Sequence, residues 1–102
     1  MQSRIISVRA FELARRIVKL CEKLWTRGPA ARKIADQLFD AATSIGANAF
    51  ESQGGQTKPD FSAKLSVSRK ESWETIFWLQ LGIASGVFSK EEVAWELDEA
   101  GS

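Results

Sequence analysis

Apolar residues recur every three or four positions along most of this chain, the spacing that places side chains on one face of an α-helix. Between about residues 3 and 26 two such runs lie side by side, and charged residues fill the other half of the helix circumference. The two runs are Phe11, Ala14, Val18, Cys21, Trp25 and Ala10, Leu13, Ile17, Leu20, Leu24. This apolar face is wider than the seam of a two-stranded coiled coil, so it favours a bundle of several helices.

A second helix is expected from about residue 30 to 52, and its pattern contains two adjacent seams. One seam is Ile34, Leu38, Ala41, Ile45, Asn48, and the other is Ala35, Phe39, Ala42, Gly46, Ala49. The second seam is mostly small, so the backbone of another helix can approach it closely. Glycine costs a helix roughly 1 kcal/mol relative to alanine, so we expect a packing reason for Gly46. A helix with two seams packs against more than one neighbour.

Two further helices are expected, over about residues 58–85 and 89–98. A turn from Gln53 to Gln56 precedes the first of them, and Thr57 is its expected cap. Its expected core seam is Phe61, Leu65, Ser68, Ser72, Ile76, Leu79 and Ile83. Ser89 and Glu92 have the spacing of a capping box at the start of the last helix, and residues 98–102 resemble a frayed tail.

These segments predict an all-α protein, an antiparallel up-down four-helix bundle formed by residues 1–102 as a single domain. A chain of 102 residues with 44% hydrophobic and 26% charged residues has enough apolar side chains for one core. No segment shows the alternation of a strand, and no internal repeat is present.

Large apolar side chains point in nearly every direction around the second half of the third predicted helix. Three companion helices would leave some of these side chains in water, so we expect an interface between subunits there. The residues expected at this interface are Trp73, Phe77, Trp78, Phe39 and Phe50.

Charge is unevenly distributed, although the net charge is only +1. Residues 1–33 contain nine lysines and arginines against two acids, whereas residues 34–102 contain five against eleven. This asymmetry indicates either an anionic partner for the basic segment or pairing between the two halves, within or between subunits. The candidate surface for RNA or DNA is the basic side of the first helix, with a solvated helix face as the alternative. Its residues are Arg15, Arg16, Lys19 and Lys23.

The chain contains no histidine, which removes the usual general base and the commonest metal ligand. We therefore expect no catalytic residues, no metal site and no cofactor. Glu71 and Glu74, with Glu51 on the neighbouring helix, are the carboxylates that a catalytic or metal site would use. Hydrogen bonding or ion pairing with lysines such as Lys64 and Lys70 is the alternative interpretation.

Two other sets of residues have both a structural and a ligand-binding interpretation. Asn48 and Ser68 are expected to form a polar pair that fixes helix register, rather than to bind a ligand. The aromatic residues Trp73, Phe77, Trp78 and Trp95 are expected in the core or at an interface, with a small-molecule pocket as the alternative.

The sequence favours a cytoplasmic protein. It contains no stretch of eighteen uncharged apolar residues and no leading charged-then-apolar segment, so we expect neither a membrane span nor a secretory signal. The single cysteine, Cys21, lies on the apolar side of the first helix and is expected to be a buried thiol rather than a reactive one.

The order and spacing of several short motifs resemble a known family. The matching segments are Gln37-Leu38, Thr43-Ser44-Ile45-Gly46-Ala47-Asn48, Glu51, Gln53, Gln56-Thr57-Lys58, Asp60-Phe61, Lys64-Leu65, Lys70-Glu71, Glu74-Thr75 and Trp78-Leu79. Together, over roughly residues 11–88, they are similar to the four-helix-bundle family named for proteins encoded in intervening sequences of 23S rRNA genes. The resemblance implies an up-down bundle that assembles into a ring-shaped homopentamer, and it implies no firm biochemical role.

Members of that family are similar to the accessory protein of diversity-generating retroelements, a basic pentamer that works with a reverse transcriptase and nucleic acid. This chain departs from the family pattern by having Asp40 where arginine is usual and Phe50 where a small residue is usual, which weakens a basic surface on the second helix. The fourth helix is also longer in the family. The leading hypothesis is a non-enzymatic homo-oligomeric assembly or scaffold protein, with a pentamer favoured by the resemblance alone. The alternative is an RNA- or DNA-binding accessory factor that uses the basic face of the first helix.

Overall fold

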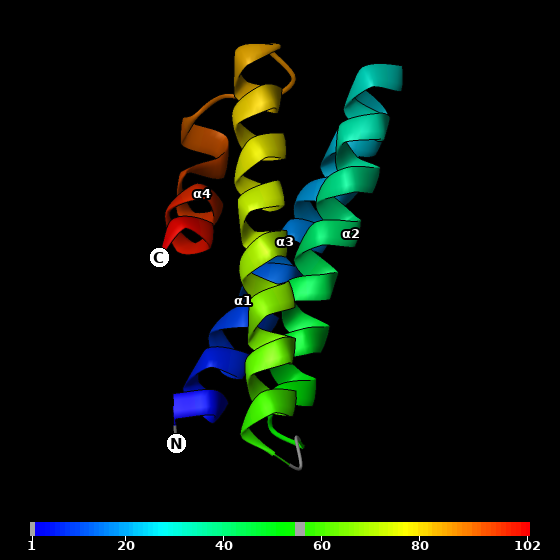
Figure 1. Ribbon diagram of the computed structural model, residues 1–102. Helices are drawn as coiled ribbons and strands as arrows, with labels where there is room; N and C mark the ends of the chain where they lie inside the picture. Colours follow the sequence, from blue (N-terminus) through cyan, green and yellow to red (C-terminus); the bar gives the residue numbers. More distant parts are fainter. Residues whose placement is uncertain (1, 55–56) are drawn as a thin grey trace.

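Four α-helices lie side by side in the computed structural model, which describes residues 2–54 and 57–102 (Figure 1). They are α1 (Gln2–Leu24), α2 (Pro29–Ser52), α3 (Lys58–Ala84) and α4 (Ala94–Gly101), with short 3₁₀ turns at Trp25–Arg27 and Glu91–Val93. Successive helices run in opposite directions, and the described residues contain no strand. The predicted antiparallel up-down four-helix bundle is therefore confirmed.

Local sequence signals account for most of the helix ends. Gly28, with φ 114°, separates the turn that ends α1 from Pro29 at the start of α2. Thr57 caps α3, since its Oγ1 accepts a hydrogen bond from the backbone N–H of Asp60 at 3.2 Å. Gly86 follows the end of α3 in the left-handed conformation, with φ 75°. Of the predicted turn before α3, Gly55 and Gln56 lie outside the described residues.

The last helix begins later than the sequence pattern predicts. The Oγ of Ser89 does accept a hydrogen bond from the backbone N–H of Glu92, at 3.1 Å. The turn that follows the cap is a 3₁₀ turn, however, and α4 begins only at Ala94. The predicted start at residue 89 is therefore wrong, because the capped turn winds more tightly than an α-helix before α4 continues.

The end of the chain is helical rather than frayed, so the predicted end at residue 98 is also wrong. α4 continues to Gly101 because Ala100 is buried against the core and the Arg9 side chain binds Glu99. Even so, α4 has only 8 residues, whereas α1 has 23 and α3 has 27. In Figure 1 it lies beside the upper part of α3 and ends well above the lower end of that helix.

The small seam of α2 is closely approached by another helix, as its composition predicts, and that helix is α1. A Cβ atom on Gly46 would stand 3.4 Å from the Cβ of Ala14 and 3.6 Å from the carbonyl oxygen of Ala10. The two helices are thus close at this point, and the other small seam residues are buried beside it. These are Ala35, Ala42 and Ala49. The contact still leaves room for one methyl group at Gly46.

The other seam of α2 faces the core and α3. Leu38 is fully buried there, and the Oγ of Ser68 on α3 donates a hydrogen bond to the carbonyl oxygen of Ile45 at 3.0 Å. The predicted pair of Asn48 with Ser68 is wrong, because the Nδ2 of Asn48 instead donates to the carbonyl oxygen of Ser44 at 2.9 Å. Each side chain donates its hydrogen bond to a backbone carbonyl of α2, so neither requires the other as a partner.

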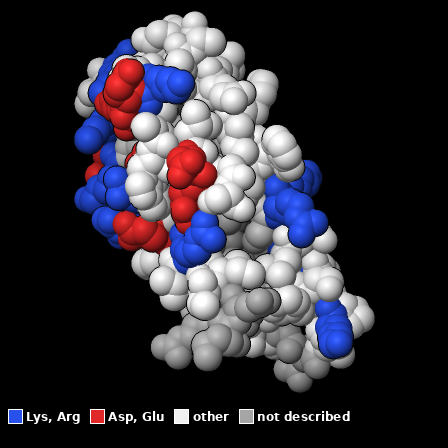
Figure 2. Space-filling model, turned by 90° about the vertical axis from the view of Figure 1, so that its left-hand side faces the viewer, with Lys and Arg blue, Asp and Glu red and all other residues white. Residues whose placement is uncertain are grey.

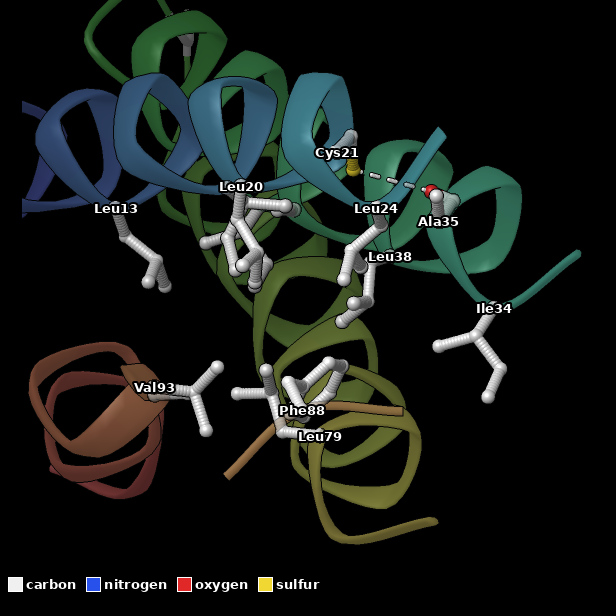
Figure 3. Close-up of a cluster of buried hydrophobic side chains, with 14 of the residues drawn as sticks. Leu13, Leu20, Cys21, Leu24, Ile34, Ala35, Leu38, Leu79, Phe88 and Val93 are labelled. Carbon is white, nitrogen blue, oxygen red and sulfur yellow. Dashed lines mark hydrogen bonds between the residues drawn. The ribbon is translucent and has the colours of Figure 1, made fainter. Parts of the chain in front are cut away.

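α3 contributes fewer large buried side chains than its predicted seam. Its buried residues are Ser68, Thr75, Leu79 and Gly82, while the predicted members Phe61, Leu65, Ser72, Ile76 and Ile83 are only half-buried. Figure 3 shows Leu79 and Phe88 pointing toward Leu24 and Leu38 in the middle of the core. The half-burial of Leu65 and Ile76 follows from the short α4, which does not cover that side of α3.

Candidate functional site

Large aromatic side chains are exposed on α1, α2 and α3. The most exposed are Phe50, at 69%, and Trp73 and Phe11, both at 68%. Surface apolar groups that occur singly need no explanation, but groups that gather on one face mark interaction sites. Whether these residues mark an interaction site therefore depends on which side of its helix each of them occupies.

One group lies along the outer side of α1 and α2. We call it the α1/α2 aromatic face: Phe11, Val18, Trp25, Phe39 and Phe50. Trp25 of the turn after α1 and Phe39 of α2 line one shallow groove between the two helices. Phe50 lies about one helical turn beyond Gly46, where α2 touches α1. The face therefore follows the seam between these two helices.

A second group lies on α3, and we call it the α3 aromatic face: Trp73, Phe77 and Leu81. These residues are four apart, so they share one side of the helix. Phe77 is two residues from buried Leu79, which at about 100° per residue places it roughly 160° from the core direction. Phe77 thus points away from the core, whereas Trp73, one turn earlier on α3, lines a hollow shared with residues of α1 and α4.

The predicted interface residues divide between these two faces. Phe39 and Phe50 lie on the α1/α2 aromatic face, and Trp73 and Phe77 lie on the α3 aromatic face. Trp78 is half-buried instead, and its ring packs edge-on against Phe77 with the centroids 5.0 Å apart and an angle of 82°. Trp78 therefore supports Phe77 from the core side.

Most of the predicted nucleic-acid-binding cations already hold carboxylates of the same chain. Arg15 binds both carboxylate oxygens of Glu12, at 2.7 and 2.9 Å, and this hydrogen bonding lowers the pKa of Glu12. Lys19 lies 3.4 Å from Glu22 one turn further along. Lys23 makes no ion pair with any residue that the structure describes. A phosphate backbone would have to displace acidic residues to bind this face.

Arg16, the fourth predicted cation, belongs to a row of ion pairs between the α1 segment and the α4 segment. The pairs are Arg9 with Glu99 at 2.9 Å, Arg16 with Glu96 at 3.5 Å, and Arg27 with Glu92 at 2.5 Å. We call this row the arginine–glutamate ladder. The guanidinium of Arg16 also lies 4.1 Å from the centre of the Trp95 ring. Figure 2 views the side on which α4 lies in Figure 1 and shows basic and acidic residues intermingled along one edge.

The ladder accounts for part of the charge asymmetry by pairing within the chain, since three basic residues of the first segment bind glutamates near the end of the chain. Sequence reasoning named Arg16 as a candidate for phosphate binding and did not single out Arg9 or Arg27. A usable signal was present, since residues 92, 96 and 99 are glutamates at helical spacing and residues 9 and 16 are arginines seven apart.

The carboxylates considered for catalysis do not form one group. Glu51 accepts a hydrogen bond from the Nζ of Lys64 at 2.7 Å, which is one of the predicted lysine pairings. Burial raises the pKa of Glu71, and the neighbouring Glu74 and Asp40 carboxylates raise it further. Within the described residues, no set of three or more potential metal ligands converges on a single point.

Cys21 is buried, as predicted, and its Sγ donates a hydrogen bond to the carbonyl oxygen of Ala35 at 3.2 Å (Figure 3). Burial raises the pKa of this thiol to about 11, so it stays protonated and unreactive near neutral pH. Across residues 2–54 and 57–102, none of the helices has the apolar length that crossing a bilayer requires.

The fold and surfaces together define an all-α four-helix-bundle protein with two exposed aromatic faces. The chain belongs to the 23S rRNA-intervening sequence protein family, whose sequence profile matches residues 2–101. It is similar to the crystal structure of a protein with unknown function from the S23 ribosomal protein family of Bacteroides thetaiotaomicron. The two are 30% identical, the match covers 99% of this chain and 89% of that chain, and the TM-score is 0.87. No curated protein matches the chain.

Proposed function

We propose that this protein is a non-enzymatic assembly protein whose copies pack into a closed homo-oligomer, with five subunits favoured by the family resemblance. The observation that carries the proposal is the presence of two separate aromatic faces on one chain. Burying an exposed phenylalanine or tryptophan side chain stabilises a complex by about 1.5–3 kcal/mol. Several such side chains per subunit would supply the free energy that a stable contact needs.

Two different faces favour a head-to-tail contact. In this arrangement the α1/α2 aromatic face of one copy covers the α3 aromatic face of the next, and both faces are buried in every subunit. A two-fold dimer that joins one face to its own copy would leave the other face in water. Head-to-tail contacts close into a ring when the rotation between subunits allows it.

The chemistry of the polar residues supports a structural role over catalysis. The chain has no histidine, and Glu12, Glu22 and Glu51 are each engaged by a basic residue. The sole cysteine is buried and has a raised pKa. Of the candidate carboxylates, Glu71 and Glu74 are left without an ion pair among the described residues, and Glu71 has a raised pKa.

Particle mass in light scattering after gel filtration tests the proposal. The unmodified protein is expected to elute with the mass of several chains. The double variant Trp73→Asp/Phe77→Asp removes both aromatic residues of the α3 aromatic face, and Phe39→Asp/Phe50→Asp removes two of the five residues of the α1/α2 aromatic face. Each is expected to give a smaller particle with unchanged helical circular dichroism. Val67→Asp replaces an apolar residue of α3 that is 40% exposed and outside both faces, and it should leave the mass unchanged.

Mixing the two double variants distinguishes a head-to-tail contact from a two-fold one. Each variant retains one intact face, so the mixture should form a particle of two chains through the single remaining complementary contact. A mixture that stays monomeric contradicts the head-to-tail arrangement. An unmodified protein that is monomeric at high concentration contradicts assembly itself.

The alternative function, RNA or DNA binding by Arg15, Arg16, Lys19 and Lys23, stays a prediction. It has less support, because three of these cations hold carboxylates of the same chain.

A further inference from the structure

The shallow groove between α1 and α2 is an apolar hollow within the α1/α2 aromatic face. It has a volume of about 300 Å³. Buried Cys21 and Ala35 form its floor, where the thiol donates to the Ala35 carbonyl oxygen (Figure 3), and the more exposed Trp25 and Phe39 line it nearer the surface. Interfaces concentrate their binding energy in pockets of this kind, each of which receives a large side chain of the partner.

The charged residues that line this groove, among those the structure describes, are both acidic: Glu22 of α1 and Asp36 of α2. Glu22 lies 3.4 Å from Lys19. Asp36 is exposed and makes no ion pair with any described residue. Arg32, one turn earlier on α2, instead donates from its Nε to the backbone carbonyl oxygen of Trp25 at 2.8 Å. The groove therefore offers the Asp36 carboxylate to a cation of another molecule.

Trp73 of the α3 aromatic face has basic neighbours. Arg69, Lys70 and Trp73 line one shallow hollow on α3, together with Glu74. Arg69 precedes Trp73 by four residues, so it extends the α3 aromatic face by one helical turn. Arg69 and Lys70 are exposed and make no ion pair with any described residue. The two cations outnumber the one carboxylate, so the charge beside Trp73 is opposite in sign to that of the residues lining the α1/α2 groove.

We propose that Trp73 of one copy enters the α1/α2 groove of the next copy, with the Arg69 guanidinium on the Asp36 carboxylate. This inference rests on the proposed head-to-tail assembly and names the residues that set its register. Trp73 supplies a large side chain that is 68% exposed in the single chain. Arg69 and Trp73 are about 6 Å apart along α3, and Asp36 and Phe39 are about 4.5 Å apart along α2, so the ionic and the apolar contact can form together.

The same charges oppose a two-fold contact. If the α1/α2 groove met its own copy, the Asp36 carboxylates would approach each other, and a two-fold contact through α3 would bring the Arg69 guanidiniums together. Like charges that face each other across an interface oppose association, whereas unlike charges favour it. The pairing of Arg69 with Asp36 therefore favours an arrangement in which each copy inserts one Trp73 and receives another.

Charge exchange between positions 36 and 69 tests this pairing on the full-length protein. Asp36→Arg and Arg69→Glu each place like charges at the contact, so each should raise the concentration at which the assembly dissociates at least about tenfold. The double variant Asp36→Arg/Arg69→Glu restores unlike charges in every contact and should recover most of that loss. Light scattering over a dilution series measures the dissociation, and circular dichroism verifies that each variant stays helical.

Asp98→Arg and Lys58→Glu are the matched controls for the two charge reversals. Both residues are exposed and make no ion pair with any described residue. They lie outside both aromatic faces, so each control makes the same change of charge without placing it at the proposed contact. The dissociation concentration of both controls should equal that of the unmodified protein.

Photocrosslinking locates the side chain at position 73 without a change of charge. In the variant Trp73→p-benzoylphenylalanine, irradiation should join position 73 to residues 18–39 of a second copy, the segment that contains the groove. Mass spectrometry of a mixture of isotopically light and heavy chains distinguishes links between copies from links within one chain.

Three results would overturn the pairing while the unmodified protein remains a particle of several chains, which leaves the assembly proposal standing. The first is an unchanged dissociation concentration in either single reversal. The second is a double variant that dissociates as readily as the single variants. The third is a crosslink from position 73 to another surface. An unmodified protein that is monomeric contradicts the assembly proposal itself, together with the inference that rests on it.

Discussion

The ring of Phe88 lies directly against Gly82 of α3. A Cβ atom on residue 82 would overlap the carbons of this ring, and both residues are buried. Glycine is therefore required at this position by the close approach of a side chain, in a helix where it otherwise lowers stability. Phe88 in turn fixes the path of the chain between α3 and α4.

Replacement of Gly82 by alanine should lower the free energy of unfolding by about 1–3 kcal/mol, because the added methyl group displaces a packed ring. This net loss arises although alanine has a helix propensity about 1 kcal/mol more favourable than that of glycine. Urea denaturation followed by circular dichroism measures the difference. Gly46→Ala is the control, since a Cβ there meets its nearest neighbour at 3.4 Å, and its stability should be equal or higher. Equal losses in the two variants would contradict this account.

The ion pair between Arg27 and Glu92 makes stability depend on acid pH. The hydrogen bond from Arg27 lowers the pKa of Glu92 below its ordinary value of 4.5. A lowered pKa stabilises the folded state above the ordinary value, and the contribution is lost as the pH falls through the lower, folded value. Glu92→Gln should therefore lower the free energy of unfolding by about 0.5–1 kcal/mol at neutral pH.

In strongly acidic solution the same substitution should have no effect, because the carboxyl group is then protonated in both states. Denaturation at two pH values measures this change. Glu22→Gln is the control, since Glu22 and Lys19 are both 67% exposed, and no loss is expected there. A loss from Glu92→Gln that is the same at both pH values would refute the electrostatic origin.

Asp40 lies near Glu71 and destabilises its ionised state. Burial, Glu74 and Asp40 raise the pKa of Glu71 above its ordinary value of 4.5. A carboxyl group with a raised pKa lowers stability as the pH rises through this range, because the unfolded chain ionises more easily. Asp40→Asn removes one of the opposing charges and should stabilise the protein by about 0.2–1 kcal/mol at neutral pH.

The gain should vanish in strong acid, where these carboxyl groups are neutral. Asp98→Asn, an exposed position on α4, serves as the control and should give no gain. A stabilisation by Asp40→Asn that persists at low pH would point to packing or helix propensity instead of charge.

The nucleic-acid alternative predicts salt-dependent binding of labelled RNA or DNA to the first helix. Each phosphate that a cation neutralises should contribute a slope of about −0.9 on duplex DNA in a plot of log affinity against log salt. Glu12→Gln frees Arg15 and should tighten binding, while glutamate at positions 15, 16, 19 and 23 should abolish it. If the protein does not change the gel mobility of the labelled RNA or DNA at low salt, this function is rejected. If binding persists after the four charge reversals, another surface binds the nucleic acid.

Helical periodicity predicted the four helices and a close helix contact at the small seam of α2, because both depend on residues near one another in sequence; that α1 makes this contact comes from the structure. The small residues around Gly46 and the cap formed by Ser89 are local signals of this kind. Periodicity did not predict the burial of Thr75 and Gly82. Their burial depends on where the chain after α3 returns and places Phe88, which no local pattern specifies.

The candidate surfaces were predicted less completely than the fold. The exposure of Trp73 and Phe50 follows from an excess of apolar residues over what one bundle can bury. Ion pairing is harder to predict, because Arg16 has the same sequence signature whether it meets a phosphate or the carboxylate of Glu96. Only the packing of α4 against α1 decides between the two.

Ion pairs with partly exposed arginines help to hold α4, which makes the C-terminal segment the part of the bundle most sensitive to ionic strength. Concentrated salt screens the ladder while leaving the buried contacts of α1 with α2 intact. Amide hydrogens in Ala94–Gly101 should then exchange with solvent sooner than those of the longer helices, in a local opening that spares the remainder. Such an opening would also release Arg9 and Arg16 of α1 from their glutamates. The salt concentration would then control how much positive charge α1 exposes to solvent.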